Sequence, residues 1–176
     1  MVEKPVKDDG VGPAEIRAGR DYLHALQRLG LEPQVMCWMY EMLDDRFEKR
    51  LGIVTSWVDR MGPALLYELL FKAYDAAATP RDIDPFIVQL YSPDSHAGAA
   101  LYRAAVKNVA PPGLEDSIEY DVIEGIYMVH TNGVPVGNGL YLARGGTYVA
   151  RRRDISAEDD RRRGQRFRRR VEALVA

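Results

Sequence analysis

A short, almost purely apolar run from Val35 to Met42 constrains the fold of this chain more than any other feature. A run of this length predicts a buried strand. Charged residues follow at 44–46, where we expect a loop, and residues 51–58 are again rich in β-branched and aromatic side chains. The pattern therefore predicts a β-hairpin in which residues 51–58 form the return strand.

Amphipathic or alanine-rich patterns predict three helices around this hairpin, over residues 13–30, 63–79 and about 95–108. Pro13 suits the first position of a helix, and Gly30 suits the left-handed residue that ends one. A further strand is expected over 86–91, after the second helix. If it shares a sheet with strand 51–58, the two strands are parallel neighbours joined by a βαβ crossover.

A Pro-Pro-Gly linker at 110–113 separates this region from a second, β-rich one. Three strands are expected there, over residues 118–130, 140–143 and 147–150. Turn signals at Asn132-Gly133 and at 137–139 join them into a meander. A final helix should begin at Ser156, where the sequence approximates a capping box.

These elements predict an α+β fold with a single mixed β-sheet, helices packed mainly on one face, a β-meander and a C-terminal basic helix. At 176 residues the chain suits one domain or two closely packed units. Composition divides it into a flexible leader over 1–12, an α/β core over 13–110, a β-meander packed on the core over 114–150, and an arginine-rich helix over 151–176.

The sequence predicts a cytoplasmic protein. No apolar run reaches the roughly 18–20 residues of a membrane helix, and the first residues lack the apolar stretch of a signal peptide. Cys37 is the only cysteine, so no intrachain disulfide can form, which suits a reducing compartment.

The charge of the chain is strongly asymmetric. Residues 151–176 contain ten arginines and five acids, a net charge of +5, whereas the rest of the chain carries −7. On the predicted helix, Phe167, Val171 and Leu174 form a narrow apolar stripe that would anchor it to the body. The arginines expected to bind a partner or phosphate are Arg152, Arg153, Arg161, Arg162, Arg163, Arg166, Arg169 and Arg170.

Three interpretations of these arginines stay open. In the first they pair with acids of the body or of a neighbouring subunit, because the arginine fork binds carboxylates in a bidentate way. The candidate acids are Glu115, Asp116, Glu119, Asp121, Glu124, Asp44, Asp45 and Glu48. In the second they follow a nucleic-acid backbone, although a sequence pI of 5.9 is low for such a protein. In the third and weakest they flank a membrane-surface or partner-groove helix, for which the apolar stripe is thin.

No catalytic, cofactor-binding or metal-binding residue is predicted, and no small-molecule ligand is inferred. His24, His96 and His130 are not spaced with other ligands as a metal site requires. Cys37 lies in the most apolar strand, where a reactive thiolate is disfavoured. The chain also lacks the glycine patterns of Walker, Rossmann and nucleophile-elbow motifs.

Two fragments resemble segments around the NAD pocket of ADP-ribosyltransferases. They are His130-Thr131 and Gly137-Asn138-Gly139-Leu140-Tyr141-Leu142-Ala143. The chain departs from that family's pattern, because Asn132 stands where a glycine is expected and the two fragments are too close together. The only later glutamates, Glu158 and Glu172, fall on the basic helix and not on a strand. A match this short has little specificity.

The sequence therefore predicts a non-enzymatic interaction or assembly protein that docks through its arginine-rich C-terminal helix. A protein partner or self-association is favoured, and no membrane partner is expected. Nucleic-acid binding by the same helix is the alternative, and an ADP-ribosyltransferase-like enzyme is the weaker one.

Overall fold

The structure is a computed structural model, which describes residues 11–43, 46–108, 133–137, 140–150 and 156–175. In chain order the elements are α1 (Pro13–Leu29), β1 (Val35–Leu43), β2 (Arg46–Val54), α2 (Trp57–Met61), α3 (Pro63–Asp75), the 3₁₀ helix η1 (Pro85–Ile87), β3 (Val88–Tyr91), α4 (His96–Asn108), β4 (Gly133–Gly137), β5 (Leu140–Ala150) and α5 (Ala157–Glu172).

The described strands form one mixed sheet in the order β3-β2-β1-β5-β4. β1 and β2 make the predicted antiparallel hairpin, with Val35 opposite Val54 and Leu43 opposite Arg46. β2 and β3 pair in parallel, so α2 and α3 cross between parallel neighbours as expected. The α+β fold with a single mixed sheet is thus confirmed.

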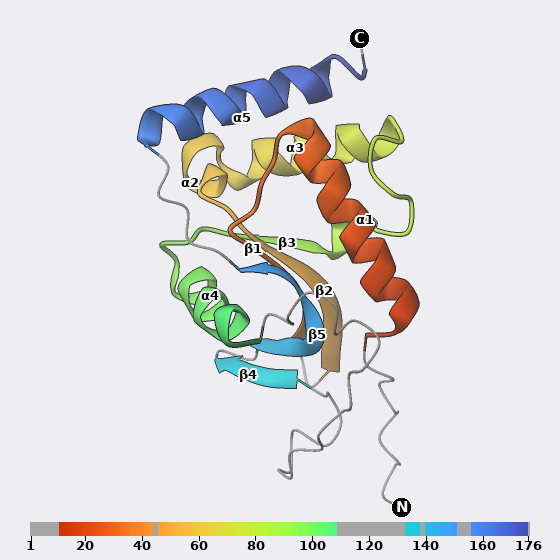
Figure 1. The fold of residues 1–176 in the computed structure, drawn as a ribbon, viewed down its shortest axis with the longest axis vertical. Coiled ribbons are helices and arrows are strands. Elements are labelled where there is room, and N and C mark those ends of the chain that lie inside the picture. The colour runs from red at the N-terminus through yellow and green to blue at the C-terminus, as the bar shows by residue number, and fades with distance from the viewer. Residues whose placement is uncertain (1–10, 44–45, 109–132, 138–139, 151–155, 176) are drawn as a thin grey trace, which may run out of the picture.

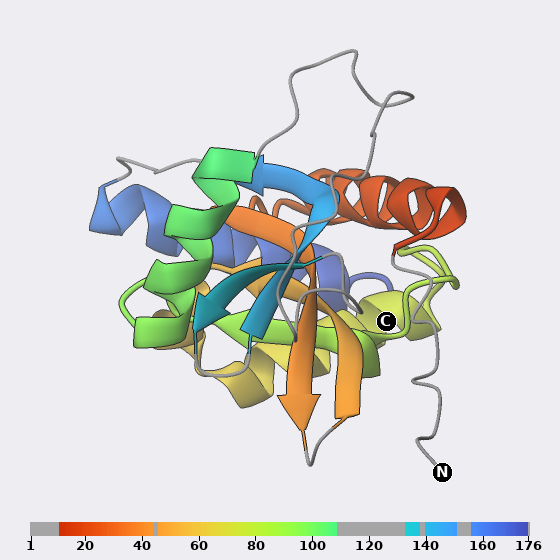
Figure 2. The same ribbon diagram turned by 90° about the horizontal axis from the view of Figure 1, so that it is seen from below.

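Four of the five described α-helices, α1, α2, α3 and α5, cover one face of the sheet, and α4 covers the other (Figure 1). The view from below shows α4 and α1 on opposite sides of the strands (Figure 2). β1 contributes side chains to the cores on both faces of the sheet, because alternate residues of a strand point in opposite directions. Met36, Trp38 and Tyr40 join the larger core under the four helices, whereas Cys37 and Met39 join the smaller core under α4.

The helix boundaries follow the capping signals in the sequence. Gly30 ends α1 with φ of 105°, a left-handed conformation that glycine adopts without steric cost. Ser156 caps α5, and its hydroxyl accepts a hydrogen bond from the backbone N–H of Asp159. No helix in the described ranges is long and apolar enough to cross a membrane.

The return strand of the hairpin differs from the prediction at both ends. β2 begins at Arg46, so the charged residues before Leu51 are paired strand residues, and it ends at Val54. Trp57 and Val58, predicted to be strand, belong to α2. The reason is tertiary: the Trp57 ring is buried against Phe167 of α5, with ring centroids 5.4 Å apart.

The described strands of the β-rich region differ from the predicted meander in their number and in their pairing. β5 is one strand over Leu140–Ala150, where two strands were expected, and it pairs with β1. A register shift between Cys37 and Met39 absorbs the extra β5 residues, so the strand continues through its glycines. β4 and β5 therefore complete the same sheet. The predicted linker at 110–113, the predicted strand over 118–130 and most of the predicted leader lie outside the described residues.

Candidate protein-docking surface on the C-terminal helix

Helix α5 lies across the outside of the helical layer, over α2 and α3 and beside the end of α1 (Figure 1). Its inner face consists of four buried residues at helical spacing: Asp160, Gly164, Phe167 and Val171. Phe167 and Val171 are fully buried in the larger core. Leu174, predicted to be the third anchor, is 44% exposed. The helix ends at Glu172, so Leu174 no longer follows the helical periodicity that would bring it onto the inner face.

The buried carboxylate of Asp160 fixes the first turn of α5 to α2. Its Oδ1 accepts a hydrogen bond of 2.9 Å from Trp57 Nε1, and its Oδ2 accepts one of 2.6 Å from Ser56 Oγ. Arg60 Nε lies 2.9 Å from the same Oδ2, and Arg60 Nη1 also donates to the carbonyl of Ala157. Sequence reasoning missed this residue. The available signal was its spacing, because Asp160 falls on the same helical face as Phe167 and Val171.

Two of the predicted arginines face the chain's own body. Arg163 Nη1 lies 3.5 Å from a carboxylate oxygen of Glu32. Arg170 Nη1 donates a hydrogen bond of 2.9 Å to the carbonyl of Arg28, at the C-terminal end of α1, where the helix dipole favours a cation. These two arginines hold α5 against the end of α1 and the segment that follows it, so their first role is structural.

Two other arginines pair within α5 itself. Arg162 pairs with Glu158, and Arg168 Nε lies 2.7 Å from Glu172, both at i,i+4 spacing. The hydrogen bond and the charge of Glu172 raise the pKa of the Arg168 guanidinium. Exposed pairs of this kind contribute only about 0.3–0.5 kcal/mol each.

The remaining arginines of α5 point outward. Arg161, Arg166 and Arg169 are exposed, and they form no ion pair or hydrogen bond with any residue that the structure describes. Arg162, Arg166 and Arg169 follow each other at i, i+4 and i+7 on the side of the helix away from the buried stripe, and Arg161 lies on the adjoining flank. At 1.5 Å per residue this row is roughly 10 Å long. We call these four residues the outer arginine row.

The predicted acidic partners do not meet these arginines in the described part of the chain. Glu48 pairs with Arg50 instead. The other seven predicted acids and Arg152 and Arg153 lie outside the described residues. Glu32, which does pair with α5, was not among the predicted acids.

The other residues considered for chemistry are dispersed. His24 is exposed on α1 and His96 is exposed at the start of α4. Cys37 is fully buried, and burial raises the pKa of its thiol to about 12. Within the described ranges, no group of three or more histidine, cysteine or acidic residues could hold a metal ion.

The fragments that resemble ADP-ribosyltransferases are only partly described. Gly137 ends β4, and Leu140 to Ala143 lie in β5 inside the sheet. His130, Thr131, Asn138 and Gly139 lie outside the described residues. Comparisons with models of protein families, with curated proteins and with solved structures found no match. The functional interpretation therefore depends on the geometry of the chain itself.

Proposed function

We propose that this protein is a non-enzymatic, cytosolic binding or assembly protein, and that the outer arginine row of α5 docks on an acidic surface of a partner protein. One observation carries the proposal. Some arginines of α5 hold the helix in place and others pair within it, whereas Arg161, Arg166 and Arg169 face solvent without an acidic partner among the described residues.

The energetics of the helix support a binding role for the row. Like charges at i,i+3 and i,i+4 destabilise a helix by about 0.2–0.5 kcal/mol per pair. The buried anchor of Phe167, Val171 and Asp160 offsets that cost. The row is therefore presented on a rigid, well-attached element, which preserves its spacing for recognition.

The charges around the row favour a protein partner over nucleic acid. Glu158 lies near one end of the row and Glu172 near the other. A phosphate backbone is uniformly negative and would be repelled by both, whereas a protein surface can place cations opposite them. The net charge of −7 over residues 1–150 adds long-range repulsion of nucleic acid.

A matched pair of double variants tests the proposal. Arg166→Gln with Arg169→Gln removes two charges from the row, and Arg17→Gln with Arg103→Gln removes two exposed charges from α1 and α4. The probes are a helical peptide with glutamates at i, i+4 and i+7, and a 12-base-pair DNA duplex, with binding followed by fluorescence anisotropy. Sedimentation velocity reports self-association in the same samples.

We expect the acidic peptide to bind wild-type protein more tightly than the duplex does at matched salt. The row variant should lose about tenfold or more in peptide affinity, or lose self-association, while the control variant keeps both. Tighter binding to the duplex, with a salt dependence of several phosphate contacts, would instead support the nucleic-acid alternative. Equal losses of peptide affinity in the two variants would show that binding depends on the net charge of the protein and not on the outer arginine row, which would contradict the proposal.

A further inference from the structure

A hollow beside the N-terminal turns of α1, at the opposite end of that helix from its contact with α5, has the composition of a small-molecule site. It encloses about 470 Å³, a volume within the usual range for such sites. Three segments form its walls: the first turns of α1, the strands β1 and β2, and the stretch from Asp82 to Ile87. We propose that it binds a small organic cation with an aromatic or aliphatic body, such as an arylalkylammonium ion.

The hollow exists because the inner face of α1 carries small residues at its start. Ala14 and Ala18 line the hollow, and the next residues on the same i,i+4 row are Tyr22 and Leu26, which are fully buried in the core. Large side chains thus fill the space under the later turns of α1. The two alanines leave it open under the first turns.

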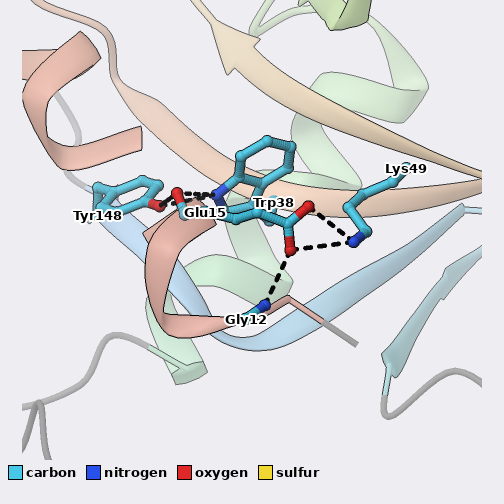
Figure 3. Close-up of polar contacts among 5 residues, drawn as sticks. All are labelled: Gly12, Glu15, Trp38, Lys49 and Tyr148. Atoms are coloured by element: carbon cyan, nitrogen blue, oxygen red, sulfur yellow. Dashed lines mark hydrogen bonds and ion pairs between the residues drawn. The ribbon is translucent and has the colours of Figure 1, made fainter. Parts of the chain in front are cut away.

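The polar wall of the hollow is held rigidly (Figure 3). Lys49 Nζ lies 2.8 Å and 3.0 Å from the two carboxylate oxygens of Glu15, and the backbone N–H of Gly12 donates to the same carboxylate at 2.8 Å. The indole of Trp38 donates to the Tyr148 hydroxyl at 2.8 Å and to the carbonyl of Glu15 at 3.2 Å. These bonds order the lining side chains before any ligand binds, so less conformational entropy is lost on binding.

The charges that line the hollow select a cation. Glu15 and Lys49 neutralise each other through their ion pair. Asp82, on the third wall, is exposed and has no ion pair or hydrogen bond to any other described residue. The lining therefore carries one unbalanced negative charge. Ala14, Ala18 and Ile87 supply apolar surface beside it, over the buried Ile83 and Trp38, so a ligand with an apolar body and one ammonium group satisfies both.

Calorimetric titration of the full chain with three isosteres tests this proposal: 2-phenylethylammonium, neutral 2-phenylethanol and anionic 3-phenylpropanoate. We expect saturable binding of the ammonium ion, with an affinity about fivefold higher than that of the alcohol. The anion should bind more weakly than the alcohol. Asp82→Asn should lower the affinity for the ammonium ion two- to fivefold, as expected for the loss of a partly exposed ion pair. Asp94→Asn, the same change at another exposed acid, should leave its affinity unchanged.

A second variant tests the location. Ala18→Leu places a larger side chain in the hollow and should reduce the affinity at least tenfold, with folding checked by circular dichroism. The outer-row variant, Arg166→Gln with Arg169→Gln, should bind the ammonium ion like wild type. Absence of saturable binding to wild type, preference for the anion, or equal weakening by Asp82→Asn and Asp94→Asn would each overturn the proposal. Undiminished binding to a folded Ala18→Leu variant would do so as well.

Discussion

Trp57 and Asp160 lie 103 residues apart in sequence, yet the indole Nε1 of one donates a 2.9 Å hydrogen bond to the carboxylate of the other. The same carboxylate accepts a hydrogen bond from Ser56 and pairs with Arg60. One acidic side chain thus joins the start of α5 to α2. Asp160 lies on the buried face of α5, and the outer arginine row lies on the exposed face. The contact with α2 therefore helps to fix the direction in which α5 presents its arginines.

Asp160→Asn tests the importance of this carboxylate. The amide keeps one acceptor oxygen but turns an NH₂ group towards a donor and leaves Arg60 without its carboxylate. We expect the free energy of unfolding to fall by about 1–3 kcal/mol, the cost of leaving buried polar groups without partners. Urea denaturation followed by tryptophan fluorescence measures the change. Glu158→Gln, two residues earlier and exposed, should change the free energy of unfolding by less than about 0.5 kcal/mol. Similar losses in both variants would contradict the assigned role.

The apolar anchor of α5 can be tested with Phe167→Ala and Leu174→Ala. Phe167 is fully buried and packs on Trp57, so its truncation should cost about 3–5 kcal/mol. Leu174 is 44% exposed, and its truncation should cost less than about 1 kcal/mol. Thermal unfolding of the two variants separates them. Equal destabilisation would mean that Leu174 does belong to the anchor.

Leu174 also shows how far the sequence could predict this molecule. The i, i+4, i+7 spacing of Phe167, Val171 and Leu174 fits a helical stripe, but periodicity does not show where a helix ends. Local signals worked where the cause was local: Pro13 and Gly30 delimit α1, and the apolar run of β1 predicts a strand buried on both faces.

The errors occurred where distant segments decide the outcome. Residues 57–58 have strand-like composition, and only the packing of Trp57 against α5 shows why they are helical. In the same way, Glu32 meets Arg163, and Asp82 lines the same hollow as Lys49, because segments far apart in sequence come together. Such contacts depend on the assembled fold, so no spacing rule along the chain predicts them.

Gly19 and Tyr148 form a second long-range contact with a clear test. A Cβ at position 19 would overlap the Tyr148 hydroxyl, which donates to the carbonyl of Ile16 at 2.9 Å and accepts from Trp38. Gly19→Ala normally favours a helix by up to about 1 kcal/mol, but here it should destabilise the protein by about 1–3 kcal/mol through the clash and the lost bonds.

Tyr148→Phe provides the matched partner for a double-mutant cycle at this contact. Removing the hydroxyl removes part of the clash, so the double variant should be more stable than the sum of the two single changes predicts. Chemical denaturation of the four proteins gives the coupling free energy. Strict additivity would show that the two residues do not interact.

Cys37 gives the protein a specific dependence on alkaline pH. Burial raises the pKa of its thiol from 9.0 to about 12, so between these values the unfolded chain loses a proton that the folded chain keeps. Ionisation then favours the unfolded state, and the stability present below pH 9 falls as pH rises, by up to about 1.4 kcal/mol per pH unit. Cys37→Ala lacks this contribution, although it should be less stable at pH 8 because it leaves a cavity. The difference in free energy of unfolding between the two proteins should therefore shrink by roughly 1 kcal/mol between pH 8 and pH 10; parallel stability curves across that range would show that the thiol is not protected by burial.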